Sequence, residues 1–152
     1  MESDSNCYIL TNQSTRLKVS STLPGNSGEY SKQNMLDNNP QTSWYSNQGK
    51  FQYICLFFDD IISINEIIIT FSGGFCPKEI ELYSSDEDQY ECKKLNLNKI
   101  TSFQINDDDN QKILKLPQKI DKCKTIKLLM KSFYDLYGRV IVYDLKVKGY
   151  KL

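Results

Sequence analysis

The chain has 152 residues, of which 39% are hydrophobic and 25% are charged, and this composition is typical of one globular domain with a buried core. Lysine and arginine together number 19, as do aspartate and glutamate, so the formal net charge is zero and gives no electrostatic basis for binding nucleic acid or an anionic membrane. The absence of histidine excludes histidine general acid–base catalysis, histidine-activated nucleophiles and histidine zinc sites.

The N-terminus and the cysteines predict an intracellular protein of the cytoplasm or nucleus. Residues 1–7 are polar and lack the basic and apolar regions of a secretory signal. The five cysteines are an odd number and are widely spaced, which predicts free thiols in a reducing compartment. Cys55 lies in an apolar stretch and is expected to be buried, whereas Cys76 follows a pair of glycines in a loop and would be reactive if exposed.

The first part of the chain is predicted to hold one strand and one short helix. Residues 1–14 are polar and are expected to be partly loose, with a short strand at 8–10. Residues 16–22 alternate between apolar and polar side chains, which predicts a half-buried strand. A loop at 24–28 follows, and Ser31 is then expected to cap a short helix that reaches Leu36.

Strand signals dominate the rest of the chain. The apolar run 51–58 predicts a buried strand, Asp59 and Asp60 predict a turn, and the isoleucine-rich run 61–71 predicts the next strand. Further strands are expected at 78–83, 90–95, 102–105, 112–116, 125–130 and 139–149, with acidic loops at 84–89 and 107–110. Many short strands with turn residues between them predict an all-β antiparallel sandwich in a single domain, residues 1–152.

Three segments resemble discoidin-type domains, which are also called coagulation-factor C-type or galactose-binding-like domains. Residues 36–44, LDNNPQTSW, are similar to the family segment LDGxPxTxW. Residues 71–83, FSGGFCPKEIELY, are similar to FxGGFxPKxIELY, and residues 133–149, FYDLYGRVIVYDLKVKG, are similar to the closing pattern DxYGRVxxYxLxVxG. The resemblance extends over residues 16–150 and implies a jelly-roll β-sandwich of the galactose-binding type.

The turn at 37–42 is a candidate calcium site. Asp37, Asn39 and Thr42 carry hard oxygen donors within one turn, which suits Ca²⁺, and the alternative is an ordinary turn held by its own side chains. In calcium-holding members of the family an acidic residue on the last strand completes the site. Asp144 stands at that position here, where the family usually has glutamate, so the resemblance implies a structural Ca²⁺ bound by these four residues. Alternation along the last strand places Tyr143 on the face opposite to Asp144.

Aromatic residues and one arginine are candidates for ligand or partner binding at one end of the sandwich. Arg139 follows a Tyr-Gly pair and could bind a carboxylate through both arms of its guanidinium, and the alternative is an internal ion pair with Asp135 or with the 37–44 turn. Trp44 and Phe133 are expected in the core. The residues predicted to form the binding surface are Tyr45, Phe75, Tyr134, Tyr137 and Arg139.

Two functional classes follow from these observations. The primary hypothesis is a non-catalytic, intracellular protein-interaction module. The ending of the chain resembles most the family of nuclear-receptor-2C2-associated proteins, which implies a nuclear receptor or another intracellular protein as partner and a link to transcription. The alternative is a carbohydrate-binding module with a glycan ligand. A glycosidase that uses the aspartates at 59–60 or 107–109 is disfavoured, because both clusters are expected in solvated turns.

Overall fold

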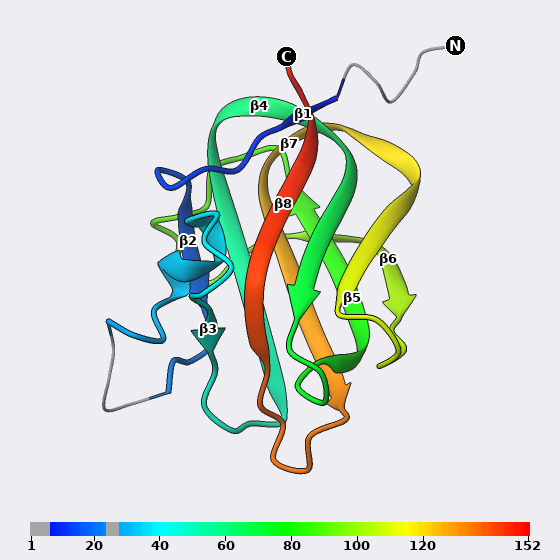
Figure 1. The fold of residues 1–152 in the computed structure, drawn as a ribbon. Coiled ribbons are helices and arrows are strands. Elements are labelled where there is room, and N and C mark those ends of the chain that lie inside the picture. The colour runs from blue at the N-terminus through cyan, green and yellow to red at the C-terminus, as the bar shows by residue number, and fades with distance from the viewer. Residues whose placement is uncertain (1–6, 24–27) are drawn as a thin grey trace.

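The computed structural model describes residues 7–23 and 28–152, and almost all of the regular structure in them is β-strand. The elements, shown in Figure 1, are β1 (Tyr8–Ile9), β2 (Arg16–Val19), the 3₁₀ helix η2 (Lys32–Leu36), β3 (Trp44–Tyr45), β4 (Phe51–Phe71), β5 (Pro77–Ser85), β6 (Asn98–Gln104), β7 (Gln111–Phe133) and β8 (Ile141–Lys151). The expected loop at 24–28 lies almost wholly outside the described residues, as does the start of the segment 1–14.

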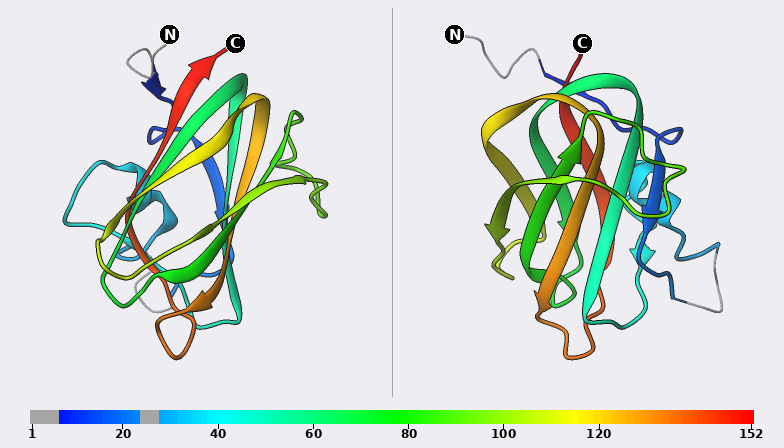
Figure 2. Two further views of the ribbon diagram at one scale, coloured as in Figure 1. Left: turned by 90° about the vertical axis from the view of Figure 1, so that its right-hand side faces the viewer. Right: turned by 180° about the vertical axis from the view of Figure 1, so that it is seen from behind.

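Two long bent strands connect the two layers of the sandwich. β4 and β7 pair antiparallel along their lengths, so that Tyr53 lies opposite Leu129 in one layer and Ile68 lies opposite Ile113 in the other. Both strands arch over at the end of the molecule where the C-terminus lies (Figures 1 and 2). β2, β5 and β6 extend the first layer, and β8 with β1 extends the second. The predicted antiparallel jelly-roll sandwich is confirmed.

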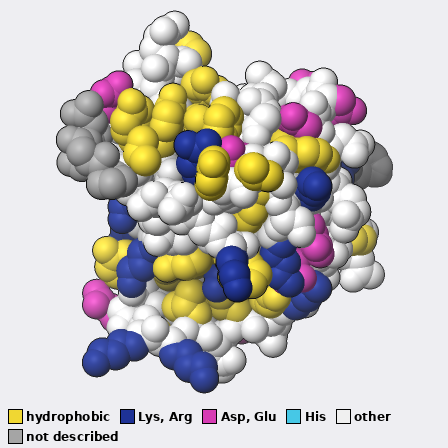
Figure 3. All heavy atoms as spheres, turned by 90° about the horizontal axis from the view of Figure 1, so that it is seen from below, with side chains coloured by type: hydrophobic (Ala, Val, Ile, Leu, Met, Phe, Trp, Pro, Cys, Tyr) yellow, Lys and Arg dark blue, Asp and Glu magenta, His cyan; other side chains and the backbone are white. Residues whose placement is uncertain are grey.

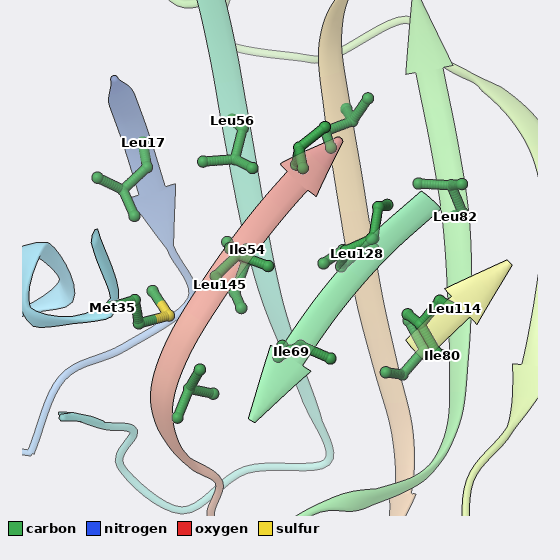
Figure 4. Close-up of a cluster of buried hydrophobic side chains, with 14 of the residues drawn as sticks. Leu17, Met35, Ile54, Leu56, Ile69, Ile80, Leu82, Leu114, Leu128 and Leu145 are labelled. Atoms are coloured by element: carbon green, nitrogen blue, oxygen red, sulfur yellow. The ribbon is translucent and has the colours of Figure 1, made fainter. Parts of the chain in front are cut away.

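The core lies between the layers and is closed on one side by η2. Its side chains come from both layers, and Figure 4 shows Ile54 and Leu128 of one layer facing Ile69 and Leu145 of the other. Met35 of η2 fills the remaining side and is fully buried. The predicted cap is present, because the Ser31 side chain accepts a hydrogen bond from the Gln33 amide at 3.2 Å.

Trp44 occupies the predicted place in the core. Its side chain is fully buried, and its indole Nε1–H donates a hydrogen bond to the carbonyl of Ser21 at 3.0 Å. This bond satisfies the one polar group that burial of tryptophan would otherwise leave without a partner. Phe133 is partly buried and packs against the core.

Two predicted strand boundaries are wrong because the strands continue through bends. Asp59 and Asp60 form no turn between separate strands, and they lie exposed at the bend of β4, where the pairing register shifts between Phe57 and Ile62. The predicted strands 112–116 and 125–130 are both parts of β7. Pro117 does not interrupt β7, because it falls in a stretch with no paired partner on β4, so no ladder hydrogen bond is lost.

The predicted strand at 90–95 is also wrong, because these residues form turns. Tyr90 instead packs edge to face on Phe57, with ring centroids 5.1 Å apart, and covers the outer face of the first layer. The Arg16 guanidinium and the Lys18 ammonium lie 4.8 Å and 4.5 Å from the Tyr90 ring centre. Cation–π contacts therefore hold this segment against β2, and strand pairing does not.

The cysteines are free thiols, and three of them are buried. Burial raises the pKa of Cys55 to about 11. Burial, aided by the Asp107 carboxylate, raises the pKa of Cys76 to about 12. Cys76 was expected to be reactive only if it were exposed. It is buried and its raised pKa disfavours the reactive thiolate form, so it is not a reactive thiol. Within the described part of the chain, no helix has the length and apolar character needed to cross a membrane.

Candidate functional site

The loop between β7 and β8 lies at the end of the sandwich opposite to the C-terminus (Figure 1). We call residues 134–140 the tip loop. The Asp135 carboxylate accepts hydrogen bonds from the backbone amides of Tyr137 at 3.2 Å and Arg139 at 3.0 Å. The Gly138 amide donates to the Asp135 carbonyl at 3.2 Å, and Gly138 adopts a φ of +72°. One aspartate therefore fixes the backbone of the whole turn.

Arg139 is held inside the tip loop by the same aspartate. Its Nε and one terminal nitrogen each donate to a different Asp135 carboxylate oxygen at 3.0 Å, which is a bidentate pair. The Arg139 guanidinium lowers the pKa of Asp135 from its ordinary value, and the Asp135 carboxylate raises that of Arg139. The structure thus contains the internal ion pair with Asp135, which was the alternative to ligand binding by Arg139. Both arms of the Arg139 guanidinium are already hydrogen-bonded within the protein.

Aromatic rings surround this ion pair. The Arg139 guanidinium carbon lies 5.5 Å from the ring centre of Phe75 and 5.3 Å from that of Tyr137. Tyr134 donates its hydroxyl to the Ile105 carbonyl at 2.7 Å, and the Lys78 ammonium lies 5.3 Å from the Tyr134 ring centre. Because these contacts fix both ends of Tyr134, its ring forms a rigid wall of the site.

The loop that precedes β4 supports the tip loop from the side. Gly49 donates its amide to the Tyr137 carbonyl at 3.1 Å. The buried Gln52 side chain donates to the Gly138 carbonyl at 2.9 Å and to the Asn47 carbonyl at 2.7 Å. A single buried amide thus joins the two loops, and its loss would leave two carbonyls without partners.

Four of the five predicted binding residues gather around the tip loop: Phe75, Tyr134, Tyr137 and Arg139. The Tyr45 ring instead stacks on Tyr30 with centroids 4.1 Å apart. Sequence reasoning missed Leu136, which is 90% exposed at the apex of the turn, while Tyr137 is 59% exposed. The signal for Leu136 was available, since a residue just after the aspartate of an Asp-x-x-Gly turn faces solvent.

A groove runs beside the tip loop. Its lining includes Gln48, Lys50, Lys78, Phe133, Tyr134 and Leu136. Figure 3 looks onto this end of the molecule, where hydrophobic side chains lie beside Lys and Arg side chains and most Asp and Glu side chains lie toward the edge. The groove lining therefore combines aromatic and aliphatic side chains with two lysines and with Asp135, whose carboxylate is paired with Arg139.

The predicted calcium turn brings three oxygen donors together. The Thr42 hydroxyl donates to one Asp37 carboxylate oxygen at 2.5 Å and lies 3.2 Å from the Asn39 carbonyl oxygen. The other Asp37 oxygen accepts the Asn39 amide at 3.0 Å. Asn38 has a φ of +56°, which accounts for the glycine that the family pattern has there.

Asp144 faces this turn across a shallow groove whose lining also includes Asp37. Its carboxylate forms an ion pair with Lys146. Within residues 7–23 and 28–152, no three acidic or cysteine side chains form a metal-binding group. The hard oxygens of Asp37, Asn39 and Thr42 suit Ca²⁺, and Asp144 would complete the site by exchanging its lysine for the ion.

We predict that Ca²⁺ stabilises the protein only at high concentration, because Lys146 competes for Asp144. At ~100 times the Kd, a bound ion would add ~2.7 kcal/mol, or about 5–10 °C in the melting temperature. Thermal melting in Ca²⁺ against excess chelator measures this shift. Asp37→Ala should abolish the shift in melting temperature. In Lys146→Ala the same shift should be reached at a lower Ca²⁺ concentration. If neither the wild type nor Lys146→Ala shows a shift, the turn holds no ion.

The aspartate clusters considered for glycosidase chemistry serve other contacts. Asp59 lies 3.5 Å from Arg16, and Asp60 lies 3.5 Å from Lys151. Asp107 accepts the Gly74 amide at 3.1 Å and so fixes the loop before β5. These carboxylates form surface ion pairs and a loop contact at separate places.

The order of the tip loop should depend on pH through Asp135. Because its folded pKa lies below the ordinary 3.8, ionised Asp135 stabilises the loop above that value, and this contribution is lost as pH falls through the lowered pKa. Amide hydrogen exchange should therefore show Arg139 losing protection in acid before the amides of β4. In Asp135→Asn the Arg139 amide should be poorly protected already at neutral pH. Equal protection in both proteins at neutral pH would contradict this role.

Comparison with known proteins shows the family to which the chain belongs. The chain belongs to the F5/8 type C domain family, which it matches over residues 16–139. Solved structures with this fold include chitosan-binding module 1 of a Paenibacillus chitosanase/glucanase, at a TM-score of 0.76, 12% identity and coverage of 93% of this chain and 99% of that one. A family 32 carbohydrate-binding module of Clostridium perfringens, in complex with galactose, aligns at a TM-score of 0.74 and 12% identity, covering 93% and 98% of the chains.

Relatives with known names indicate a smaller group of proteins to which the chain is similar. The chain is 31% identical to the nuclear receptor 2C2-associated protein of Danio rerio over 138 residues, which cover 91% of this chain and 93% of that protein. It is 30% identical to the human protein of the same name, over 89% of this chain and 91% of the relative. The resemblance read from the three sequence motifs is confirmed.

Proposed function

We propose that this protein is a non-catalytic binding module that captures a protein partner through the tip loop. The observation that carries this proposal is the exposure of Leu136 and Tyr137 on a turn already fixed by Asp135. An exposed apolar side chain on a rigid loop loses little conformational entropy on binding, so most of its burial contributes to affinity. Large side chains held in this way are typical anchors of protein interfaces.

The names of the relatives support a nuclear receptor as the first candidate partner and an intracellular site of action related to transcription. The free cysteines are compatible with a reducing compartment. The Arg139 guanidinium contacts the rings of both Phe75 and Tyr137, and Arg139 and Phe75 are proposed to support Tyr137. Tyr134 and Tyr45 are proposed to contribute at the margins of the contact.

The test is titration of the purified protein with nuclear receptor 2C2. The double variant Leu136→Ser, Tyr137→Ser should weaken binding by at least about tenfold, since hot-spot truncations cost about 2 kcal/mol or more. Its melting temperature should stay close to that of the wild type, because both side chains are exposed. Ile113→Ser removes another apolar side chain, 53% exposed on β7 and away from the tip loop, and this control variant should bind normally. Undiminished binding by the double variant would refute a role for the tip loop.

Carbohydrate binding is the second candidate, and a groove beside β8 favours it. A register shift between Thr70 and Phe71 makes Tyr143 the extra residue of β8, so the simple alternation of faces along the strand is interrupted at Tyr143. Tyr143 then lines a groove with Asn38, Thr70 and the Asp144–Lys146 pair. An aromatic ring beside amide, hydroxyl and charged groups suits a sugar. Galactose titration should give heat with the wild type and none with Tyr143→Ala, and loss with Tyr137→Ala would instead place the sugar at the tip loop.

A further inference from the structure

Two lysines line the tip-loop groove without an ion-pair partner in the part of the chain that the structure describes. Lys50 and Lys78 both line the groove, and neither ammonium lies within ion-pair distance of a carboxylate of the described residues. Lys78 is held in place by its contact with the Tyr134 ring at 5.3 Å. The groove therefore presents two cations, one of them held by an aromatic ring, that have no carboxylate partner among the described residues.

Other positively charged side chains near the groove form ion pairs with carboxylates. Arg139 is paired with Asp135, and Lys131 lies 3.1 Å from Glu81. Glu81 has its pKa lowered to about 2 by a hydrogen bond from Tyr83 and by the ammonium groups of Lys99 and Lys131. Arg139 has a carboxylate of its own, and Lys99 and Lys131 share that of Glu81, so Lys50 and Lys78 differ from these cations in having no carboxylate within ion-pair distance among the described residues.

We propose that the partner presents a short acidic segment in which carboxylates flank one large apolar side chain. This inference rests on the proposed function and names the chemistry of its partner. The apolar side chain would lie against Phe133, Tyr134 and Leu136, and the carboxylates would reach Lys50 and Lys78, which line the same groove. Charge complementarity of this kind fixes orientation and speeds association, while the apolar contact supplies most of the affinity.

A membrane with anionic lipids offers the same charge but a different shape. The binding surface here is a groove, and Leu136 is one aliphatic side chain beside two lysines. Stable attachment to a membrane needs more than one weak apolar or electrostatic signal. A peptide segment fills a groove and can place its carboxylates at set positions, so the geometry favours the peptide.

The experiment is selection of displayed random 12-residue peptides on the wild-type protein, with affinities of the selected peptides then measured on three variants. Lys50→Gln, Lys78→Gln removes the two lysine charges of the groove. Lys119→Gln, Lys122→Gln removes two exposed lysines elsewhere on β7 and gives the same net charge. Leu136→Ser removes the apolar tip. The same proteins are sedimented with vesicles of phosphatidylcholine containing one-fifth phosphatidylserine.

Selected peptides should be rich in Asp and Glu around one Leu, Ile, Phe or Trp. Their affinity should fall by about 2- to 25-fold in the Lys50/Lys78 variant, because each of two surface ion pairs is worth at most about fivefold, and it should be unchanged in the Lys119/Lys122 variant. Neutral or basic peptides that depend on Leu136 would overturn the acidic chemistry and leave the proposed function standing. Absence of any Leu136-dependent peptide would count against both. Vesicle binding lost in the Lys50/Lys78 variant would assign the charges to a membrane and overturn the inference.

Discussion

Gly149→Ala should destabilise the protein by more than about 3 kcal/mol, because overpacking against backbone cannot be relieved by a side-chain movement. Gly149 lies on β8 opposite Ile64, and an added Cβ would lie 1.8 Å from the Ser63 carbonyl oxygen and 3.0 Å from the Ile64 Cα. To make room, β8 would have to move away from β4 and break the ladder that holds the second layer together.

Chemical denaturation of the variant measures the loss in the free energy of unfolding. Gly73→Ala is the matched control, since its Cβ would meet only the Asn110 side chain at 3.7 Å. That variant should unfold within about 1 kcal/mol of the wild type. If Gly149→Ala proves insoluble, the soluble yield of the two variants gives the same comparison. Equal stability of both would show that β8 and β4 can separate at little cost.

The second large effect is expected at the tip loop, where Gly138→Ala should lower both stability and partner binding. Gly138 adopts a φ of +72°, and its added Cβ would lie 1.9 Å from the Gly49 carbonyl oxygen. The tip loop would have to swing away from the loop before β4. This movement would break the bonds from Gly49 to the Tyr137 carbonyl and from Gln52 to the Gly138 carbonyl.

Backbone strain and steric clash can be separated by a second glycine. Gly74 has a similar φ of +82°, but an added Cβ there meets no atom within 4 Å. Gly74→Ala should therefore cost only the strain of a left-handed alanine, about 1 kcal/mol, whereas Gly138→Ala should cost about 2–4 kcal/mol. Melting curves give the stability difference, and titration with the partner gives the affinity. A Gly138→Ala protein that binds normally would show that the position of the tip loop is unimportant.

The sequence allowed the fold to be predicted because its motifs and its alternation agree. Trp44 could be assigned to the core and Ser31 to a helix cap from local chemistry alone, and the structure has both. The errors arose where a distant segment decides the conformation. Asp59 and Asp60 look like a turn in sequence, and only the pairing of β4 with β7 on both sides of them makes the segment a bend. Tyr90 looks like a strand residue until Phe57 is placed beneath it.

The aromatic residues of the candidate site could be predicted from the sequence, but the hydrogen bonds that position them could not. Tyr134 and Tyr137 lie close together in sequence, so their grouping follows from one loop. Gln52, by contrast, is a single polar residue in an apolar strand, and its role depends on carbonyls contributed by the distant Gly138 and the nearby Asn47. The bulge at Tyr143 depends on the register between β8 and β4, which no local pattern encodes.

The two bent strands make the sandwich a single cooperative unit. β4 and β7 each contribute one half to each layer, so neither layer can melt while the other keeps its two central strands. We therefore expect the two layers to unfold together, because opening one layer would remove the continuation of both central strands of the other. The tip loop lies at the opposite end from both bends, so we expect changes in its exposed side chains Leu136 and Tyr137 to alter the proposed recognition without weakening that cooperativity (Figure 1).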